Sequence, residues 1–193
     1  GDHTLVLGHS FGSIVTAAAL ANGLSVRAAV LVNPISAPAL EGPRGLLSKL
    51  ASGYYRIGKA LPSGMGNALL RSRAIVRLTS ASMVKSPDPH MRRFVHAQHD
   101  AYFSSFADRD SLNESFETSI SHTVADFAAA ISVPVLVVAA ERDDITPLAA
   151  QHALTGELEQ AELAIVPRVG HLVHYETPAV AIEHVRDFWS RVR

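Results

Sequence analysis

The stretch that decides the fold lies at residues 5–12 and reads LVLGHSFG. Its apolar start is typical of a buried strand, and the alanine-rich segment 14–21 after it is typical of a helix. Between them stands the pattern G-x-S-x-G, formed by Gly8, Ser10 and Gly12. A serine at such a sharp strand-to-helix turn is exposed for reaction, and the glycines keep side chains out of the close approach between strand and helix. The pattern alone also occurs in structural and phosphate-binding turns, so it needs support from the rest of the chain.

Three further apolar runs predict strands, at residues 28–32, 133–140 and 163–166. Helical patterns cover residues 148–154 and 178–192, and the latter begins with a proline, which suits the first turn of a helix. Continuous apolar strands that alternate with helices predict a parallel sheet with helices on both faces. The fold class expected from the sequence is therefore α/β, with about four parallel strands.

The segment 39–130 interrupts this alternation, because it contains helix-like stretches and no convincing strand. The helix-like stretches are residues 45–60, 67–79, 89–105 and 123–131. We expect residues 1–38 and 131–193 to form the α/β core and residues 39–130 to form a helical insertion.

A serine hydroxyl becomes a good nucleophile only when a base takes its proton and a carboxylate orients that base. The predicted third strand is followed by ERDDITP at residues 141–147, which offers Asp143 and Asp144 as acids. The predicted fourth strand is followed by RVGH, which ends at His171. Both loops follow buried strands at the carboxyl end, where α/β sheets place their sites. The alternatives are a solvated charged loop and an ordinary loop histidine.

Taken together, these segments resemble the lid-bearing α/β-hydrolase family. The resemblance rests on LVLGHSFG, on AERD-x-x-x-P at residues 140–147, and on Gly170-His171 followed by Glu176, Pro178 and a final amphipathic helix. It covers nearly the whole chain, and it implies Ser10 as nucleophile, His171 as base and Asp143 as acid. Asp143 is favoured over Asp144 because it stands third after Ala140, the position where the family usually has a glycine.

The resemblance also implies an oxyanion hole that uses the backbone N–H of Phe11. The family's second donor comes from a loop ahead of the serine turn, and the chain is expected to begin at the fifth of eight strands. These 193 residues are then the C-terminal half of the family's sheet, with an exposed apolar first strand. By themselves they are expected to be weakly active or inactive, since loss of one oxyanion donor costs roughly a hundredfold or more in rate.

Composition excludes several other kinds of protein. The formal net charge of -1 gives no global reason to expect a nucleic-acid partner. The absence of cysteine excludes disulfides and thiolate metal sites, and no apolar run is long enough for a transmembrane helix. The ten histidines are scattered without a recognisable ligand set, and no dinucleotide fingerprint occurs. We therefore expect no metal and no cofactor; the oligomeric state is open.

Eight of the twelve aromatic residues fall in the insertion, including Tyr54, Tyr55, Phe103 and Phe106. These rings suit either the apolar wall of a substrate pocket or a small helical core. Residues 44–93 also carry ten Lys and Arg and one acid. Such a basic face suits an anionic substrate or a membrane surface, and equally a solvated helix face.

The function expected from the sequence is hydrolysis of a moderately apolar carboxylic ester, lactone or thioester through a serine acyl-enzyme. Hydrolysis of carbon–carbon bonds and acyl transfer use the same three residues. A non-catalytic ligand-binding or receptor protein on this fold is the alternative from another class. The identity of the small-molecule substrate does not follow from the fold.

Overall fold

The computed structural model describes residues 3–38 and 45–192. The chain divides into two compact units: unit 1 joins Gly1–Ala37 to His122–Arg193, and unit 2 is Pro38–Ser121. The second boundary between them falls at residues 121 and 122, whereas the sequence placed it at residues 130 and 131. The reason is that Val124, Ala128 and Ile131 are buried in the core of unit 1.

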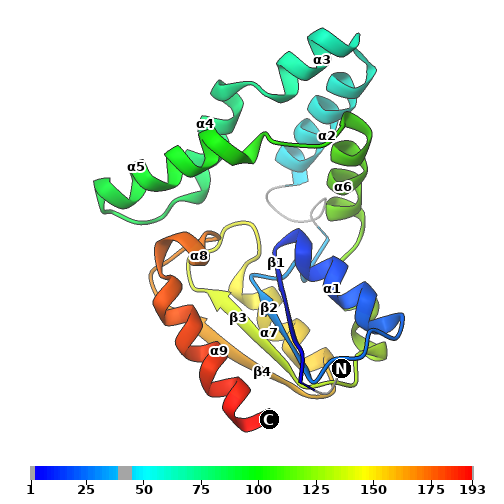
Figure 1. Cartoon of the computed structure of the whole chain (residues 1–193), viewed down its shortest axis with the longest axis vertical. Helices are drawn as coiled ribbons and strands as arrows, with labels where there is room; N and C mark the ends of the chain where they lie inside the picture. The colour runs from blue at the N-terminus through cyan, green and yellow to red at the C-terminus, as the bar shows by residue number, and fades with distance from the viewer. Residues whose placement is uncertain (1–2, 39–44, 193) are drawn as a thin grey trace. The chain divides into compact units, whose positions relative to one another are not determined.

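Unit 1 is built on four parallel strands in the sheet order β1-β2-β3-β4 (Figure 1). The strands are β1 Leu5–His9, β2 Ala28–Val32, β3 Val135–Ala140 and β4 Ala161–Val166. Every residue of β2 and β3 is buried, as expected for central parallel strands covered on both faces.

Alternate residues of these strands enter two separate apolar layers. Leu31 and Val137 pack on one face with three helical segments, and Val30 and Val138 pack on the other face with two. The first group is α1 Phe11–Ala21, the 3₁₀ helix η2 Ala125–Ala130 and α7 Leu148–Glu157; the second is α8 Val173–Glu176 and α9 Pro178–Val192. The predicted α/β class, with four parallel strands and helices on both faces, is confirmed.

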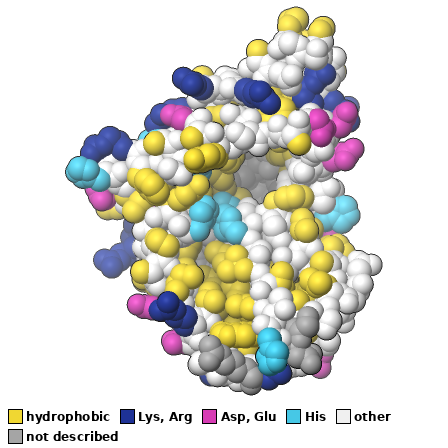
Figure 2. Space-filling view, viewed as in Figure 1, with side chains coloured by type: hydrophobic (Ala, Val, Ile, Leu, Met, Phe, Trp, Pro, Cys, Tyr) yellow, Lys and Arg dark blue, Asp and Glu magenta, His cyan; other side chains and the backbone are white. Residues whose placement is uncertain are grey.

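The first strand lies at one edge of the described sheet, as the sequence predicted. Its Leu7 side chain is 52% exposed. Figure 2 views unit 1 with β1 toward the reader and shows hydrophobic side chains gathered on that side. An apolar, unpaired strand edge of this kind is a site for pairing with another strand.

Unit 2 consists, in its described part, of helices joined by short turns. They are α2 Gly45–Ala60, α3 Ser63–Leu70, α4 Arg73–Met83, α5 Pro89–Gln98, the π-helix η1 His99–Phe103 and α6 Arg109–Ser121. The single helix predicted over residues 67–79 is wrong, because Ser72 adopts an extended ψ of 114° between α3 and α4. Helix α6 was not predicted, and the helix expected at residues 123–131 is the 3₁₀ helix η2.

Two contacts hold α2 against its neighbours in unit 2. A Cβ added at Gly58 would lie 2.5 Å from Cγ of Leu70, so the missing side chain allows α3 to approach. Nη1 of Arg109 donates to the carbonyl oxygens of Gly58, Lys59 and Leu61, at 3.0, 3.2 and 2.7 Å. These bonds satisfy carbonyl groups that the end of a helix leaves without an intrahelical donor. None of the described helices is both long and apolar enough to cross a membrane.

Candidate active site

Ser10 stands at the turn between β1 and α1 in a backbone conformation that side chains rarely adopt, with φ 51° and ψ -119°. Its N–H donates to the carbonyl oxygen of Val32 at 3.0 Å, which continues the β1–β2 pairing into the turn. Strain of this kind persists only where the surrounding structure enforces it, and it is concentrated at functional sites.

The close approach of strand and helix requires a glycine at one of the two expected positions. A Cβ added at Gly8 would lie 2.4 Å from the carbonyl oxygen of Gly12 and 2.5 Å from Oγ1 of Thr16. At Gly12 an added Cβ would meet no described atom within 4 Å. The predicted clash is therefore present at Gly8, and the same prediction is wrong for Gly12.

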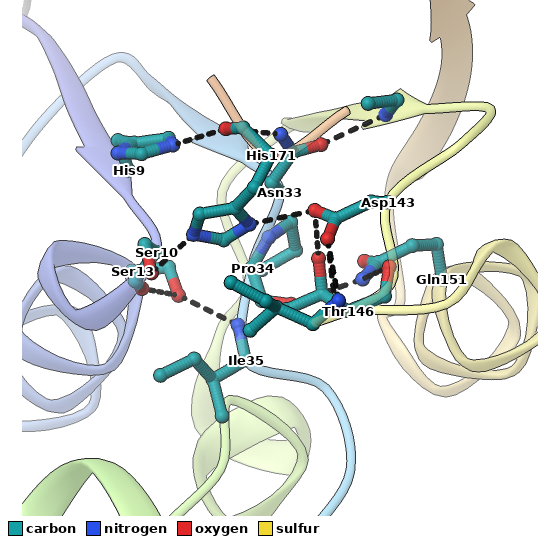
Figure 3. Close-up of polar contacts among 12 residues, drawn as sticks. His9, Ser10, Ser13, Asn33, Pro34, Ile35, Asp143, Thr146, Gln151 and His171 are labelled. Atoms are coloured by element: carbon teal, nitrogen blue, oxygen red, sulfur yellow. Dashed lines mark hydrogen bonds and ion pairs between the residues drawn. The ribbon is translucent and has the colours of Figure 1, made fainter. Parts of the chain in front are cut away.

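The three side chains singled out in the sequence form one hydrogen-bonded chain (Figure 3). Nε2 of His171 lies 2.8 Å from Oγ of Ser10, and Nδ1 of His171 lies 2.7 Å from Oδ2 of Asp143. An ionised carboxylate only accepts hydrogen bonds, so Nδ1 carries the proton and Nε2 is free to accept the hydroxyl proton of Ser10. His171 is 3% exposed, and the Asp143 side chain is fully buried.

Asp143 receives two donors on each carboxylate oxygen. Oδ1 accepts the backbone N–H groups of Ile145 and Thr146 at 2.7 and 3.1 Å, and Oδ2 accepts the Thr146 hydroxyl at 2.6 Å together with His171. Burial raises the pKa of Asp143, but the hydrogen bonds from His171 and Thr146 outweigh it and hold that pKa below its usual value. Asp144, the other acid considered, is exposed and does not take this place.

The backbone of His171 is also held, by residues that the sequence did not single out. Its carbonyl oxygen accepts Nδ2–H of Asn33 at 2.9 Å and Nε2–H of His9 at 3.0 Å. Burial, reinforced by the charge that His171 and His174 can carry, lowers the pKa of His9 to about 4, so His9 is neutral at neutral pH. His9 is the last residue of β1, and Asn33 directly follows β2. This position at a strand end is the only signal in the sequence that could have pointed to them.

Phe11 begins α1 directly after Ser10, and its backbone N–H lies at the positive end of the helix dipole. The Phe11 N–H donates to no backbone carbonyl oxygen among the described residues. An N–H group in this position can donate a hydrogen bond to an oxyanion that develops beside the serine.

The four aromatic residues proposed for a substrate pocket do surround one cavity, which lies within unit 2. Tyr54, Tyr55, Phe103 and Phe106 line a space of about 30 Å³. Pockets for small-molecule ligands run to roughly 300–1,000 Å³, and 30 Å³ is about the share of one water molecule. Tyr54, Tyr55 and Phe106 are half-buried, as in the small helical core that the sequence offered as the other interpretation, whereas Phe103 is 47% exposed.

The basic helices of unit 2 are partly neutralised by acids from later in the same unit. Lys59 pairs with Asp110 at 3.0 Å, and Arg77 pairs with Asp100. In Figure 2, acidic side chains lie among the basic ones over the helices of this unit. Among the residues that the structure describes, no group of three or more His, Asp and Glu side chains could hold a metal ion.

Comparison with known proteins bears on the same segments. Residues 1–184 match the model of a family described as the Alpha/beta hydrolase family. No curated protein sequence matches the chain.

Several solved structures share the fold at low sequence identity. A thermophilic esterase from Thermogutta terrifontis is 17% identical with a TM-score of 0.73, over 98% of this chain and 65% of the other. The enol-lactonase from Burkholderia xenovorans LB400 is 16% identical with a TM-score of 0.73, over 98% and 66%. A 2-hydroxy-6-oxo-6-phenylhexa-2,4-dienoate hydrolase from Rhodococcus sp. strain RHA1 is 20% identical with a TM-score of 0.67, over 98% and 64%. The chain thus spans slightly under two thirds of these proteins, and the likeness shows a shared fold.

Proposed function

The chain belongs to the alpha/beta hydrolase family, and on this premise we propose that it is a serine hydrolase acting through Ser10, His171 and Asp143. Ser10 is the nucleophile, His171 the general base and Asp143 the acid that orients the base. The substrate is a carboxylic ester, lactone or thioester of moderately apolar character, and the intermediate is an acyl-enzyme.

One observation carries the proposal: the unbroken chain of hydrogen bonds from Ser10 Oγ through the His171 ring to Asp143, at 2.8 and 2.7 Å. These distances lie within the range over which a base can take a proton from a nucleophile. The three residues come from positions far apart in the sequence. If residues 141–147 were only a solvated charged loop and His171 only an ordinary loop histidine, nothing would require them to lie beside a strained serine in this geometry.

In the first half of the reaction, Oγ of Ser10 attacks the substrate carbonyl carbon while Nε2 of His171 takes the hydroxyl proton. The resulting imidazolium is stabilised by the Asp143 carboxylate, whose low pKa keeps it charged. The carbonyl oxygen becomes an oxyanion, and the Phe11 N–H donates to it. His171 then gives its proton to the leaving alcohol or thiol, which departs.

In the second half, His171 takes a proton from a water molecule, and the resulting hydroxide attacks the acyl carbon. The imidazolium returns the proton to Oγ of Ser10 as the acid product leaves. Weak activity of these 193 residues alone stays a prediction, because it depends on a second oxyanion donor that the family resemblance places outside them.

The choice of ester, lactone or thioester rests on the chemistry of the three residues and on fold neighbours that include an esterase and an enol-lactonase. Carbon–carbon bond hydrolysis and acyl transfer use the same nucleophile and base, and the fold does not select among them. In chain order, unit 2 falls between β2 and β3. We assign it the role of the family's variable cap as part of the proposal.

A fluorophosphonate probe tests the proposal, because it reacts covalently with an activated serine. We expect labelling at Ser10 that disappears in Ser10→Ala. The matched control is Ser190→Ala, which removes an exposed hydroxyl bonded to the Asp187 carbonyl oxygen and should label normally. A folded protein that never labels would contradict the proposal and favour a ligand-binding protein on the same fold.

A further inference from the structure

The loop that follows β2 contributes no residue to the proposed triad, yet hydrogen bonds connect it, directly or through one side chain, to the segments that carry all three triad residues. It contains Asn33, Pro34 and Ile35, which we call the 33–35 segment. Asn33 is hydrogen-bonded directly to the loop of the base, whereas Pro34 and Ile35 are linked to the acid loop and the serine turn through one side chain each, from α7 and α1 (Figure 3).

Asn33 links the loop of the base to the central strand. Its Nδ2–H donates to the carbonyl oxygen of His171 at 2.9 Å, and its Oδ1 accepts the N–H of Ala140, at the end of β3, at 2.8 Å. Its own N–H donates to the carbonyl oxygen of Val138 at 2.8 Å. The backbone of His171 is thus tied to β3, which leads directly into the loop that carries Asp143.

The other two residues of the segment reach the remaining loops through buried side chains. Nε2 of Gln151 donates to the carbonyl oxygens of Pro34 and Thr146, at 3.0 and 3.3 Å. The N–H of Ile35 donates to Oγ of Ser13 at 3.2 Å. Oγ of Ser13 in turn donates to the carbonyl oxygen of Ser10 at 2.5 Å.

Burial makes these links stiff. Asn33 is 1% exposed, and Gln151 and Ser13 are fully buried, so water does not compete for their hydrogen bonds. Asn33 also has a φ of 42°, a conformation that asparagine adopts more readily than most residues. A carboxamide is both donor and acceptor, which allows one side chain to bind a carbonyl oxygen and an N–H at once.

We propose that Asn33 is a positioning residue of the triad, which fixes the backbone of His171 relative to the end of β3 and thereby aligns its ring between Ser10 and Asp143. This inference rests on the proposed function. Asn33 touches neither the reacting hydroxyl nor the acid; it acts through His171. Small displacements of a catalytic group, of about an ångström, can slow a reaction roughly a hundredfold.

Two variants distinguish the loss of the donor to His171 from the loss of both side-chain hydrogen bonds of Asn33. Asn33→Asp keeps the shape and the acceptor for Ala140 but replaces the donor to His171 with a repelling oxygen. Asn33→Gly removes both side-chain bonds and accommodates the positive φ. We expect both to label with fluorophosphonate roughly ten- to a hundredfold more slowly per folded molecule. In Asn33→Asp, the midpoint of the labelling pH profile should also move to higher pH, because the added negative charge favours protonated imidazole.

The matched control is Asn22→Gly, which removes an exposed carboxamide that donates to the Ala18 carbonyl oxygen at the far end of α1. It should label at the parent rate. If the parent protein labels and a folded Asn33 variant does so at the same rate and pH midpoint, the inference is wrong. If the parent never labels Ser10, the proposed function itself fails.

Should neither Asn33 variant fold, hydrogen exchange in the parent protein decides. The side-chain amide protons of Asn33 should exchange far more slowly than those of Asn22, since only the former are buried and bonded to His171. Equal exchange rates would overturn the inference, because a carboxamide that opens freely cannot hold the His171 loop in place.

Discussion

The hydroxyl of Thr146 and Nδ1–H of His171 share one acceptor, Oδ2 of Asp143, at 2.6 and 2.7 Å. Because the other carboxylate oxygen is held by two backbone N–H groups, the acid cannot rotate without losing bonds on both sides. The arrangement keeps the carboxylate charged and fixes its orientation beside the imidazole.

Replacing Asp143 with asparagine should therefore slow fluorophosphonate labelling of Ser10 by roughly a thousand- to ten-thousandfold. An amide at this position does not stabilise the imidazolium and can present N–H to Nδ1, which leaves His171 in the wrong tautomer. Asp144→Asn is the control, since Asp144 is exposed next to it in the chain. Equal losses in both variants, measured as second-order labelling rates, would contradict the assignment of the acid.

Gly8→Ala should destabilise the protein by about 1–3 kcal/mol or more, because the new Cβ would overlap the Gly12 carbonyl group and the Thr16 side chain. Gly12→Ala should change the stability much less, since its Cβ would enter open space within the described residues. Urea unfolding of the two variants measures both effects. The opposite order would show that the turn is not held by the contact at Gly8.

Alanine substitutions at two glycines of α2 should change the free energy of unfolding in opposite directions. Gly53→Ala should raise the free energy of unfolding by about 0.5–1 kcal/mol, because alanine restricts the unfolded chain and its Cβ meets no described atom within 4 Å. Gly58→Ala should lower it by about 1–3 kcal/mol, because Leu70 occupies the space of the new Cβ. Thermal unfolding of both variants beside the parent checks the packing of α3 on α2.

The lowered pKa of His9 makes the free energy of unfolding depend on pH. Its pKa is lowered from 6.5 to about 4 in the folded protein, so the unfolded chain binds more protons between these values. The stability associated with neutral His9 is therefore complete above pH 6.5 and is lost as the pH falls toward 4, by up to about 3 kcal/mol.

In His9→Gln, the decline of the unfolding free energy between pH 6.5 and 4 should be shallower than in the parent. His152→Gln, which replaces an exposed histidine, should keep the parent's slope. Urea unfolding at a series of pH values measures both. Identical slopes in the parent and His9→Gln would mean that His9 is not held neutral.

Local patterns predicted the elements that are simple to recognise. Strand β2 was predicted at its observed bounds because it is a run of five apolar residues, and α9 because Pro178 marks its start. Helix α6 was missed because only Ile120 within it is buried, which leaves a weak apolar period. The turn between α3 and α4 was missed because apolar residues continue through it at helical spacing. Only the backbone angles of Ser72 in the structure show that the helix is interrupted there.

The sequence likewise predicted some residues of the candidate site and missed others. Ser10, Asp143 and His171 follow from a glycine-flanked serine and from loops after predicted strands, and the structure places their side chains within hydrogen-bonding distance. Asn33 also follows a predicted strand, but its residue type does not mark it as part of a site, and Gln151 lies within a helix. Their partners lie 138 and 117 positions away and are backbone carbonyl groups, which carry no side-chain signature in a sequence.

The side chains of His9, Ser13, Asn33 and Thr146, which hydrogen-bond to the triad residues, all come from unit 1. Replacing the segment between Ala37 and His122 removes none of these four side chains. Under the proposed role of unit 2 as a cap, exchanging this insertion should change substrate preference while the nucleophile and the base stay the same.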